Sequence, residues 1–318
     1  MTTTLSVVVP VRDVARYVPD LLRSLLHNTR RDFEFLVVDD ASRDRTAELV
    51  AGAGVPGLRL IRHPAPLGPG AARNTGLAQA SGRYLTYLDG DDWIRPGYLA
   101  ELVAAISGLG CDFVIGDHIR VTGRRRQPRR PPQGRLREVL DPRASILPVG
   151  QPSMVDYPYC WAGVYDRRLA ERGLLDFAPG LHTAEDRPWF WRLYRQASSY
   201  AVVPLRGVFY RRHREGALTR IGDERQLHFF DAFDLVLAEL AADPEAERFA
   251  PKAVRGYFAV IGYHLTRRAR LSPPLRVELV DRARAAMLAV PPELRAEVLP
   301  AMGVYRQELF EELLGVRI

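Results

Sequence analysis

The residues whose types and spacing could do chemistry are concentrated in "YLDGDDW". This stretch places three carboxylates, Asp89, Asp91 and Asp92, within four positions directly after an apolar run. Mg²⁺ and Mn²⁺ prefer oxygen ligands, and one or two carboxylates together with phosphate oxygens can bind them. An Asp-x-Asp pair at the end of a strand therefore predicts a metal site for a nucleotide diphosphate. The cation would make the diphosphate a better leaving group.

A structural interpretation of the same stretch is also open. A solvated turn could use an aspartate to cap the following helix, "IRPGYLAELVAAI". Of the three aspartates, Asp92 fits a structural role best. It could cap the helix or support the metal ligands without binding the metal itself. Gly90 would remove side-chain bulk where the substrate approaches the backbone. The letters "DGDD" by themselves leave the metal site and the turn equally open.

Two further acidic pairs could complete a site. "FLVVDD" ends a second apolar run with Asp39 and Asp40, and "TAEDRPWFW" carries Glu185 and Asp186 at a predicted helix start. A reaction in which a hydroxyl attacks needs a carboxylate to take the proton of that hydroxyl. A structural interpretation is open for these pairs too. Acidic residues are favoured in the first turn of a helix, and an aspartate after a strand can cap the next helix.

The apolar pattern predicts the elements that position these acids. Runs such as "LSVVVPV", "FEFLVVDD", "LRLIRH" and "RYLTYLDGDD" are typical of strands buried on both faces. Segments with helical spacing, such as "VARYVPDLLRSLLHN", separate them. This alternation predicts a doubly wound, mostly parallel α/β sheet. Ligands bind beyond the carboxyl ends of such strands, so the two aspartate clusters should share one crevice.

Five motifs in order carry a resemblance to a known family. "SVVVPV", "FLVVDDASRD", "GAARNTGL", "YLTYLDGDDWIRPGYL" and "HTAEDRPWFWRL" together resemble the family 2 glycosyltransferases of the GT-A fold, over about residues 4–215. The resemblance implies a Rossmann-like fold and an inverting enzyme. Such an enzyme moves a sugar from a nucleotide-diphosphate sugar, here expected to be a UDP-sugar, to an acceptor hydroxyl. The chain looks most similar to members that put N-acetylglucosamine on wall teichoic acid.

The resemblance also implies which residues hold the nucleotide. Pro10 and Val11 match strand-end positions that pack around the base, and Asp40 matches an acid that accepts a hydrogen bond from the uracil imide. Arg12 stands where the family usually has an aromatic residue. A guanidinium can stack on a base as well, so Arg12 is kept among the nucleotide-binding residues while the identity of the base becomes less certain.

The remaining roles follow the same resemblance. Arg73 matches an arginine near the nucleotide phosphates, although a surface arginine at a helix start is the alternative. Asp89 matches a ribose or metal contact and Asp91 the direct ligand of Mn²⁺ or Mg²⁺. Asp186 matches the catalytic base, with Glu185 as a supporting contact. The QxxRW signature of processive members is absent, so repeated chain extension is not expected.

Composition limits the class of protein. The chain has 318 residues, 47% of them apolar, and a net charge of +7, which favours anionic partners. Its two cysteines, Cys111 and Cys160, are too few for a disulfide framework. No signal peptide or long apolar span is visible, so a cytoplasmic protein is expected, with peripheral contact to the inner face of the membrane left open.

The charge is concentrated in "GRRRQPRRPPQGRLR", residues 123–137, which we expect to be a loop. It could be a plain solvated loop or an electrostatic surface for a phosphate-bearing acceptor. Nucleic acid is not expected, because no aromatic residues are interleaved to stack on bases. Arg212, His213 and Arg214 after the last strand could fold over phosphates or form a solvated loop.

Beyond about Asp223 every segment has helical spacing. We therefore expect a GT-A domain over residues 1–220 and a helical domain over residues 221–318. An apolar stripe that includes Phe229, Phe230 and Phe233 favours core packing, with homo-oligomerisation or lipid contact as the alternatives.

Two other functions compete with sugar transfer. A nucleotidyl- or glycerophosphotransferase could use a similar metal cleft but would make different products. A non-catalytic polyanion-binding protein would depend on the arginine segment alone. Its binding would weaken steeply with salt and need no divalent cation.

Overall fold

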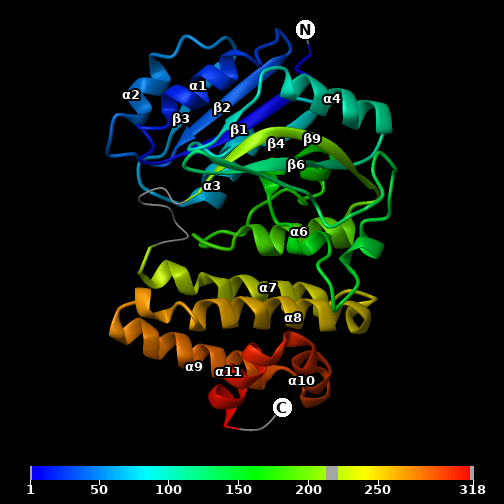
Figure 1. The fold of residues 1–318 in the computed structure, drawn as a ribbon. Helices are drawn as coiled ribbons and strands as arrows, with labels where there is room; N and C mark the ends of the chain where they lie inside the picture. Colours follow the sequence, from blue (N-terminus) through cyan, green and yellow to red (C-terminus); the bar gives the residue numbers. More distant parts are fainter. Residues whose placement is uncertain (1, 213–220, 316–318) are drawn as a thin grey trace.

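Four parallel strands form the amino-terminal part of the sheet (Figure 1). The computed structural model describes residues 2–212 and 221–315, and within them the sheet has nine strands. The order across this part is β3-β2-β1-β4, so β1 lies between the two strands that end in acids. β1, β2 and β4 are buried, as the apolar pattern predicted. The same prediction was wrong for β3, which is partly exposed because it lies at the edge of the sheet. These strands are β1 (Leu5–Val11), β2 (Phe33–Asp39), β3 (Leu58–Arg62) and β4 (Tyr84–Tyr87).

The rest of the sheet is mixed. β8 pairs antiparallel with β4 and with β6, β6 and β9 run parallel, and β5 pairs antiparallel with β9. The α/β class and GT-A architecture are thus as predicted. The described sheet as a whole is mixed and not mostly parallel, because every pair that involves β5, β7 or β8 is antiparallel. These strands are β5 (Trp93–Ile94), β6 (Phe113–Thr122), β8 (Gly163–Asp166) and β9 (Tyr200–Arg211).

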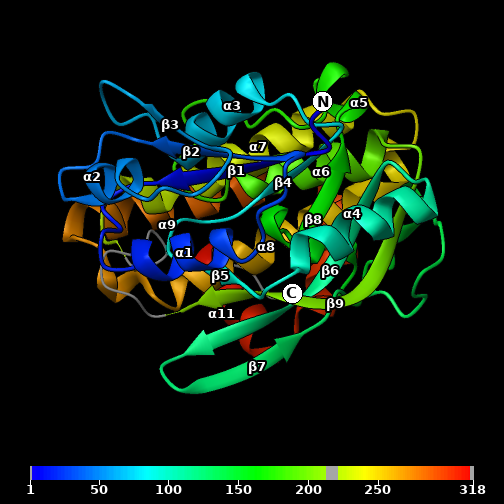
Figure 2. The same ribbon diagram turned by 90° about the horizontal axis from the view of Figure 1, so that it is seen from above.

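The arginine segment is not wholly a loop, and that prediction was wrong. Strand β7 (Arg125–Arg129) pairs antiparallel with β6 and forms a hairpin that projects from the sheet (Figure 2). β7 is an edge strand, so Pro128 needs no partner for a missing N–H and arginine side chains can point into water. Composition alone suggested a loop because these residues are individually poor strand formers.

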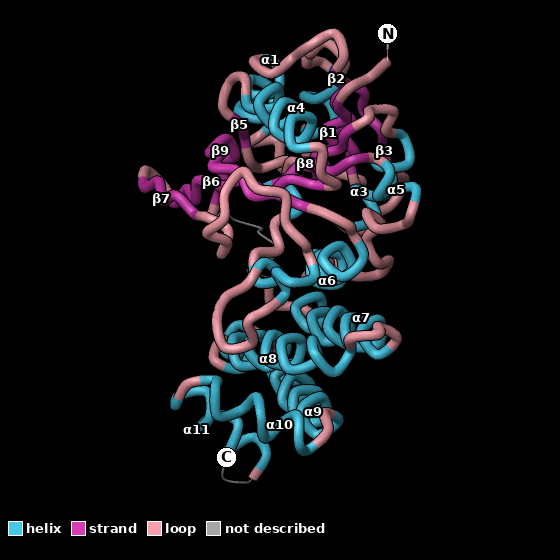
Figure 3. The backbone as a smooth tube through the Cα atoms, turned by 90° about the vertical axis from the view of Figure 1, so that its right-hand side faces the viewer, coloured by secondary structure: helices cyan, strands magenta, loops and turns pink. Residues whose placement is uncertain are grey.

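Helices cover both faces of the sheet (Figures 1 and 3). α1 (Val18–Leu26) and α4 (Tyr98–Leu109) lie on one face, while α3 (Pro69–Gln79) and α6 (Asp186–Gln196) lie on the other. The short helices α2 (Thr46–Ala51) and α5 (Arg168–Glu171) lie beside these layers. The result is the doubly wound arrangement that the alternating pattern predicted.

Five helices form a stack beyond α6 in the described part of the chain (Figure 1). Phe229, Phe230 and Phe233 are buried in a second hydrophobic core, whereas Val236 and Leu240 of the same helix join the core under the sheet. The apolar stripe is therefore used inside the chain. The domain boundary at residue 221 stays a prediction, because α7 serves both cores. The helices are α7 (His228–Ala241), α8 (Ala246–Leu265), α9 (Pro273–Ala289), α10 (Pro292–Val298) and α11 (Val304–Leu314).

Among the described residues, none of the helices is both long enough and apolar enough to span a bilayer. Cys111 and Cys160 are both buried free thiols.

Candidate active site

The two acidic turns flank the carboxyl end of β1. The Asp40 N–H donates to the Val11 carbonyl at 2.9 Å, and the Gly90 N–H donates to the Pro10 carbonyl at 3.2 Å. Because β1 lies between β2 and β4, the turns that follow those strands meet over its end. The structure therefore brings Pro10, Val11, Asp40 and the "DGDD" turn together, at the strand ends where α/β sheets bind ligands.

Packing within the protein is one reason for glycine at position 90. A Cβ at this position would lie 2.6 Å from Val11 Cγ1 and 2.9 Å from the Pro10 carbonyl oxygen. These contacts are too short for real Cβ atoms, and one of them is with backbone that cannot turn away. Close packing of the turn on β1 therefore requires a residue without a Cβ. The approach of substrate to the backbone at Gly90 stays a prediction.

Asp40 anchors the loop before α3. Its side chain accepts hydrogen bonds from the N–H groups of Leu67 (2.8 Å) and Gly68 (2.9 Å), and its Oδ1 lies 2.8 Å from His63 Nδ1. Only 3% of the residue is exposed, and the Arg12 guanidinium lies 3.7 Å from its Oδ2. The hydrogen bond to uracil stays a prediction. The loop anchor and His63 were missed, because a Pro/Gly segment indicates a turn but not what holds it.

Asp39 does not cap a helix, so that alternative was wrong. Its Oδ1 accepts from the Ser42 N–H at 3.2 Å, and its Oδ2 accepts from Arg62 Nε at 3.1 Å. Helix α2 begins at Thr46, whose N–H instead donates to Asp44 Oδ1. Asp39 thus shapes the turn that follows β2 and lies beside the predicted nucleotide-binding residues as a structural group.

Arg73 connects the "DGDD" turn to the "AED" segment. Its side chain donates to Asp89 Oδ1 at 2.9 Å and to Glu185 Oε1 at 2.7 Å. The guanidinium lies over the Phe177 ring, and only 5% of the residue is exposed. Arg73 is therefore not a surface arginine. A guanidinium suits this position because its planar donors can serve two carboxylates at once.

Asp92 is a structural acid rather than a helix cap. α4 begins at Tyr98 after Gly97, whereas Asp92 Oδ1 accepts from the Arg211 N–H at 2.6 Å. Asp92 is 1% exposed, and its Oδ2 has no hydrogen-bond partner among the described residues. Burial raises the pKa of Asp92 well above its usual value, and the charges of Asp91 and Asp89 add to the rise.

The donor set of this turn fits a divalent cation bound together with phosphates. No group of three or more His, Cys, Asp or Glu side chains in the described chain is arranged to hold a metal alone. Mg²⁺ commonly needs only one or two carboxylates beside substrate phosphates. The negative charge around Asp91 and Asp89, which already disfavours ionisation of Asp92, is what a cation would offset. Asp91 with Asp89 stays the predicted ligand pair.

Asp186 begins α6, directly after the residue that Arg73 holds. Burial raises the pKa of Asp186 to about 7; the Glu185 carboxylate adds to the rise, and Arg187 and Arg73 oppose it. A carboxylate is an effective general base when its pKa lies near the working pH. The environment of Asp186 therefore suits the predicted role of taking a proton from an acceptor hydroxyl.

Arg211 is a site residue that the sequence reasoning missed. Its Nε donates to the Asp91 carbonyl at 2.9 Å, and its guanidinium lies over the rings of Tyr17 and Trp93. Arg212, for which phosphate contact and a solvated loop were both open, donates to the Tyr210 hydroxyl at 2.9 Å. The predicted positions 213 and 214 lie outside the described residues. The basic run "YRRHR" was a signal for this region in the sequence. It did not indicate which of its arginines reaches the "DGDD" turn.

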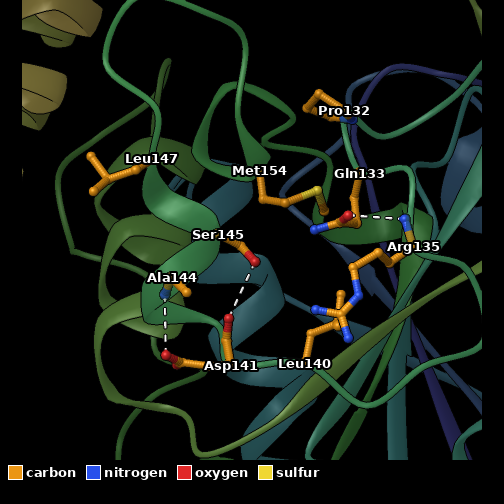
Figure 4. A pocket seen from close by; sticks show the side chains of 9 residues that line it. All are labelled: Pro132, Gln133, Arg135, Leu140, Asp141, Ala144, Ser145, Leu147 and Met154. Atoms are coloured by element: carbon orange, nitrogen blue, oxygen red, sulfur yellow. Dashed lines mark hydrogen bonds between the residues drawn. The ribbon is translucent and has the colours of Figure 1, made fainter.

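A pocket of about 260 Å³ lies elsewhere, and none of the predicted site residues lines it (Figure 4). Its polar groups are engaged with each other: the Ser145 hydroxyl donates to the Asp141 carbonyl, and the Arg135 N–H donates to Gln133 Oε1. It offers no acid pair and no cation-binding group of the kind found at the end of β1. The acidic turns at the carboxyl end of β1 are therefore the candidate active site.

A model of the family described as "Glycosyl transferase family 2" matches residues 6–171. The chain belongs to glycosyl transferase family 2. It is therefore an enzyme of sugar transfer, and the predicted family and enzyme class are confirmed. The non-catalytic polyanion-binding alternative is set aside.

Two bacterial relatives align with most of the chain. The uncharacterized glycosyltransferase EpsJ of Bacillus subtilis is 25% identical over 319 residues, which cover 90% of this chain and 91% of EpsJ. The succinoglycan biosynthesis protein ExoO of Rhizobium meliloti is 29% identical, with 86% of this chain and 80% of ExoO covered.

A third relative has solved structures. The poly(ribitol-phosphate) beta-N-acetylglucosaminyltransferase TarS of Staphylococcus aureus is 27% identical over 239 residues, which cover 74% of this chain but 40% of TarS. Residues 1–349 of TarS in complex with UDP-GlcNAc superimpose with a TM-score of 0.73 at 20% identity, covering 99% of this chain and 93% of that one. This likeness establishes the shared fold.

Proposed function

We propose that this family 2 glycosyltransferase is an inverting, divalent-cation-dependent enzyme that uses a UDP-sugar and a hydroxyl acceptor on a glycan or phosphate-containing cell-surface polymer. The observation that carries the proposal is the pair of hydrogen bonds from Arg73 to Asp89 and Glu185. They place the predicted donor-binding turn beside the helix start that bears Asp186. A donor bound at that turn would meet a carboxylate suited to proton transfer.

The donor would lie over the end of β1. Val11 and Arg12 would pack on the base, and Arg73 would compensate the charge of the diphosphate. Asp91 with Asp89 would hold Mn²⁺ or Mg²⁺, which neutralises the diphosphate and so improves it as a leaving group. The support for UDP as nucleotide is the likeness to TarS, which was solved with UDP-GlcNAc and UDP.

The chemical step is a displacement at the anomeric carbon. The acceptor oxygen attacks that carbon from the side opposite the diphosphate and forms the new C–O bond. The bond between the anomeric carbon and the diphosphate oxygen breaks, its electrons stay with UDP, and the acceptor proton moves to the Asp186 carboxylate. An α-linked donor then gives a β-linked product.

The β6–β7 hairpin supports an acceptor that carries phosphate. Arg124, Arg126 and Arg129 make no ion pair with any described carboxylate, so their charge is available to an anionic ligand. The Arg126 guanidinium lies 5.9 Å from the centroid of Trp93, the residue directly after the "DGDD" turn. The hairpin thus lies next to the donor turn. The relative TarS is named as a poly(ribitol-phosphate) beta-N-acetylglucosaminyltransferase, which agrees with such an acceptor.

The first experiment measures thermal stability with UDP, UDP-GlcNAc and UDP-glucose, with and without Mn²⁺, for the wild type and Asp91→Asn. A ligand that binds the folded state raises the melting temperature by mass action. We expect a shift that requires Mn²⁺ and is lost in Asp91→Asn. An equal shift without cation or in the variant would overturn the metal assignment.

Analysis of the nucleotide product distinguishes the proposed glycosyltransferase from a nucleotidyl- or glycerophosphotransferase. Turnover of the sugar nucleotide by a glycosyltransferase releases UDP, whereas a nucleotidyl- or glycerophosphotransferase breaks a bond between or beyond the phosphates. Mass spectrometry of the nucleotide product therefore decides between them. Detection of UMP in place of UDP would overturn the sugar-transfer chemistry proposed for this site.

A further inference from the structure

The turn that leads into α6 has a strained backbone. Ala184, between Thr183 and Glu185, has a φ of +57°, in the left-handed region that residues with a Cβ rarely adopt. Such a conformation persists only where the surroundings impose it, and it is found most often at functional sites. The question is which part of the chain imposes this one.

The residues that hold the turn come from the start of the helical region. The His182 N–H donates to His228 Nδ1 at 3.0 Å, and the Thr183 hydroxyl donates to the Arg225 carbonyl at 2.5 Å. The Ala184 side chain packs against the second hydrophobic core. His182 and Thr183 therefore contact the segment that begins α7, and Ala184 packs on the core of the helical region.

The other end of the same two helices is fastened as well. Arg192 and Arg195 of α6 both bind the Glu239 carboxylate of α7, at 2.8 and 3.1 Å. α6 and α7 lie side by side along their length (Figure 1). The position of α6, and of Asp186 at its first turn, is therefore fixed from α7 at both ends.

The opposite side of the turn touches the nucleotide loop. The His182 ring packs on Gly68, where an added Cβ would lie 2.8 Å from His182 Nδ1. Gly68 has a φ of +96° and donates its N–H to Asp40. His182 thus lies between the loop anchored by Asp40 and the His228 side chain.

We infer that the Arg225–His228 segment at the start of α7 is a positioning element for catalysis, holding the strained turn so that Glu185 reaches Arg73 and Asp186 faces the acceptor. The inference rests on the proposed function, because it assigns Asp186 the role of base. It gives the helical region a part in the reaction and not only in packing. His228 is the positioning residue that can be changed with the least loss of apolar contact.

The test compares His228→Leu with His228→Asn. Asparagine keeps an oxygen that can accept from the His182 N–H, and leucine does not. We expect kcat for UDP release from UDP-GlcNAc with Mn²⁺ to fall by on the order of tenfold in His228→Leu, with KM little changed, because misplacing a catalytic group acts on the chemical step. His228→Asn should recover most of the loss.

Two further measurements distinguish a positioning role of His228 from a general loss of stability in the helical region. The pH at which kcat/KM reaches half of its plateau should move downward in His228→Leu, because a released turn leaves Asp186 better hydrated. Leu279→Ala, a cavity in the second core away from the turn, should lower the melting temperature without moving that pH. Ala184→Gly should partly restore kcat in His228→Leu, since glycine adopts a positive φ without strain.

Hydrogen exchange supplies a test that needs no turnover. The His182 amide should lose protection in His228→Leu and keep it in His228→Asn. Unchanged protection, or equal kcat and pH dependence in all three proteins, would overturn the inference. If the wild type releases no UDP from any donor, the proposed function fails, while the exchange experiment still decides whether His228 holds the turn.

Discussion

Arg73 and Glu185 are 112 residues apart in the chain, yet the guanidinium Nη1 of one lies 2.7 Å from Oε1 of the other. The same guanidinium holds Asp89. The buried Arg73 guanidinium thus connects the turn expected to bind the donor with the turn that leads to the expected base, Asp186. The predictions below follow from that connection and from the groups around it.

Arg73→Gln should lower kcat/KM by on the order of a hundredfold, because both carboxylates lose the donor that fixes their position. Arg73→Lys should recover little of the activity, since an ammonium lacks the planar donors that bind two acids at once. Steady-state kinetics with UDP-GlcNAc and Mn²⁺ measure both. Full activity in Arg73→Lys would show that charge alone matters here.

Asp186→Asn should lower kcat by about 10²- to 10⁴-fold, the range of a lost general base, while donor binding stays close to wild type. Glu185→Gln is the matched control, because it removes the neighbouring charge and leaves the expected base. Turnover and UDP binding by calorimetry are compared for both variants. If Glu185→Gln is the more damaging change, the base has been assigned to the wrong residue.

The raised pKa of Asp186 predicts how activity and stability depend on pH. A base must be deprotonated, so kcat/KM should rise with pH through a value of about 7. The folded pKa lies above the unfolded one, so ionisation of Asp186 opposes folding at neutral and alkaline pH and not in acid. Asp186→Asn should therefore melt higher than wild type at pH 8. The two proteins should converge near pH 4; a gap that stayed constant would contradict the assignment.

Gly90→Ala should destabilise the fold by about 1–3 kcal/mol, because the new methyl group overlaps Val11 and the Pro10 carbonyl. Displacement of the turn should also weaken donor binding. Gly97→Ala is a useful comparison, since a Cβ there meets no atom within 4 Å and only its φ of +75° is unfavourable. Chemical denaturation of the two variants shows whether crowding at β1 is the larger effect.

Replacing Arg124, Arg126 and Arg129 together by glutamine should weaken binding of a phosphate-bearing acceptor and flatten its salt dependence, with hydrolysis of the donor unchanged. The acceptor KM, measured from 50 to 300 mM salt as a rough working range, gives the result. A neutral glycan acceptor provides the control. An unchanged KM for the phosphate polymer would leave the hairpin with the structural task of protecting a sheet edge.

The sequence by itself determined the fold class, the positions of strands β1 to β4 along the chain and the family. These features depend on short stretches of sequence. A continuous β-branched run indicates a buried strand, and the acids that follow parallel strands come to the same edge of the sheet. The motifs around Asp40 and Asp89 could be found for that reason, whereas Asp186, at the start of α6, was found through the family resemblance.

The tertiary structure decided what those residues touch. Asp40 is engaged by the loop before α3, and Asp92 holds the Arg211 N–H, 119 residues away, instead of capping α4. The left-handed turn at Ala184 is held by Arg225 and His228. Residues expected to be a loop form β7 because β6 offers an edge. Each of these depends on groups far apart in the chain. No local pattern records such contacts, because their energy exists only once the elements have packed.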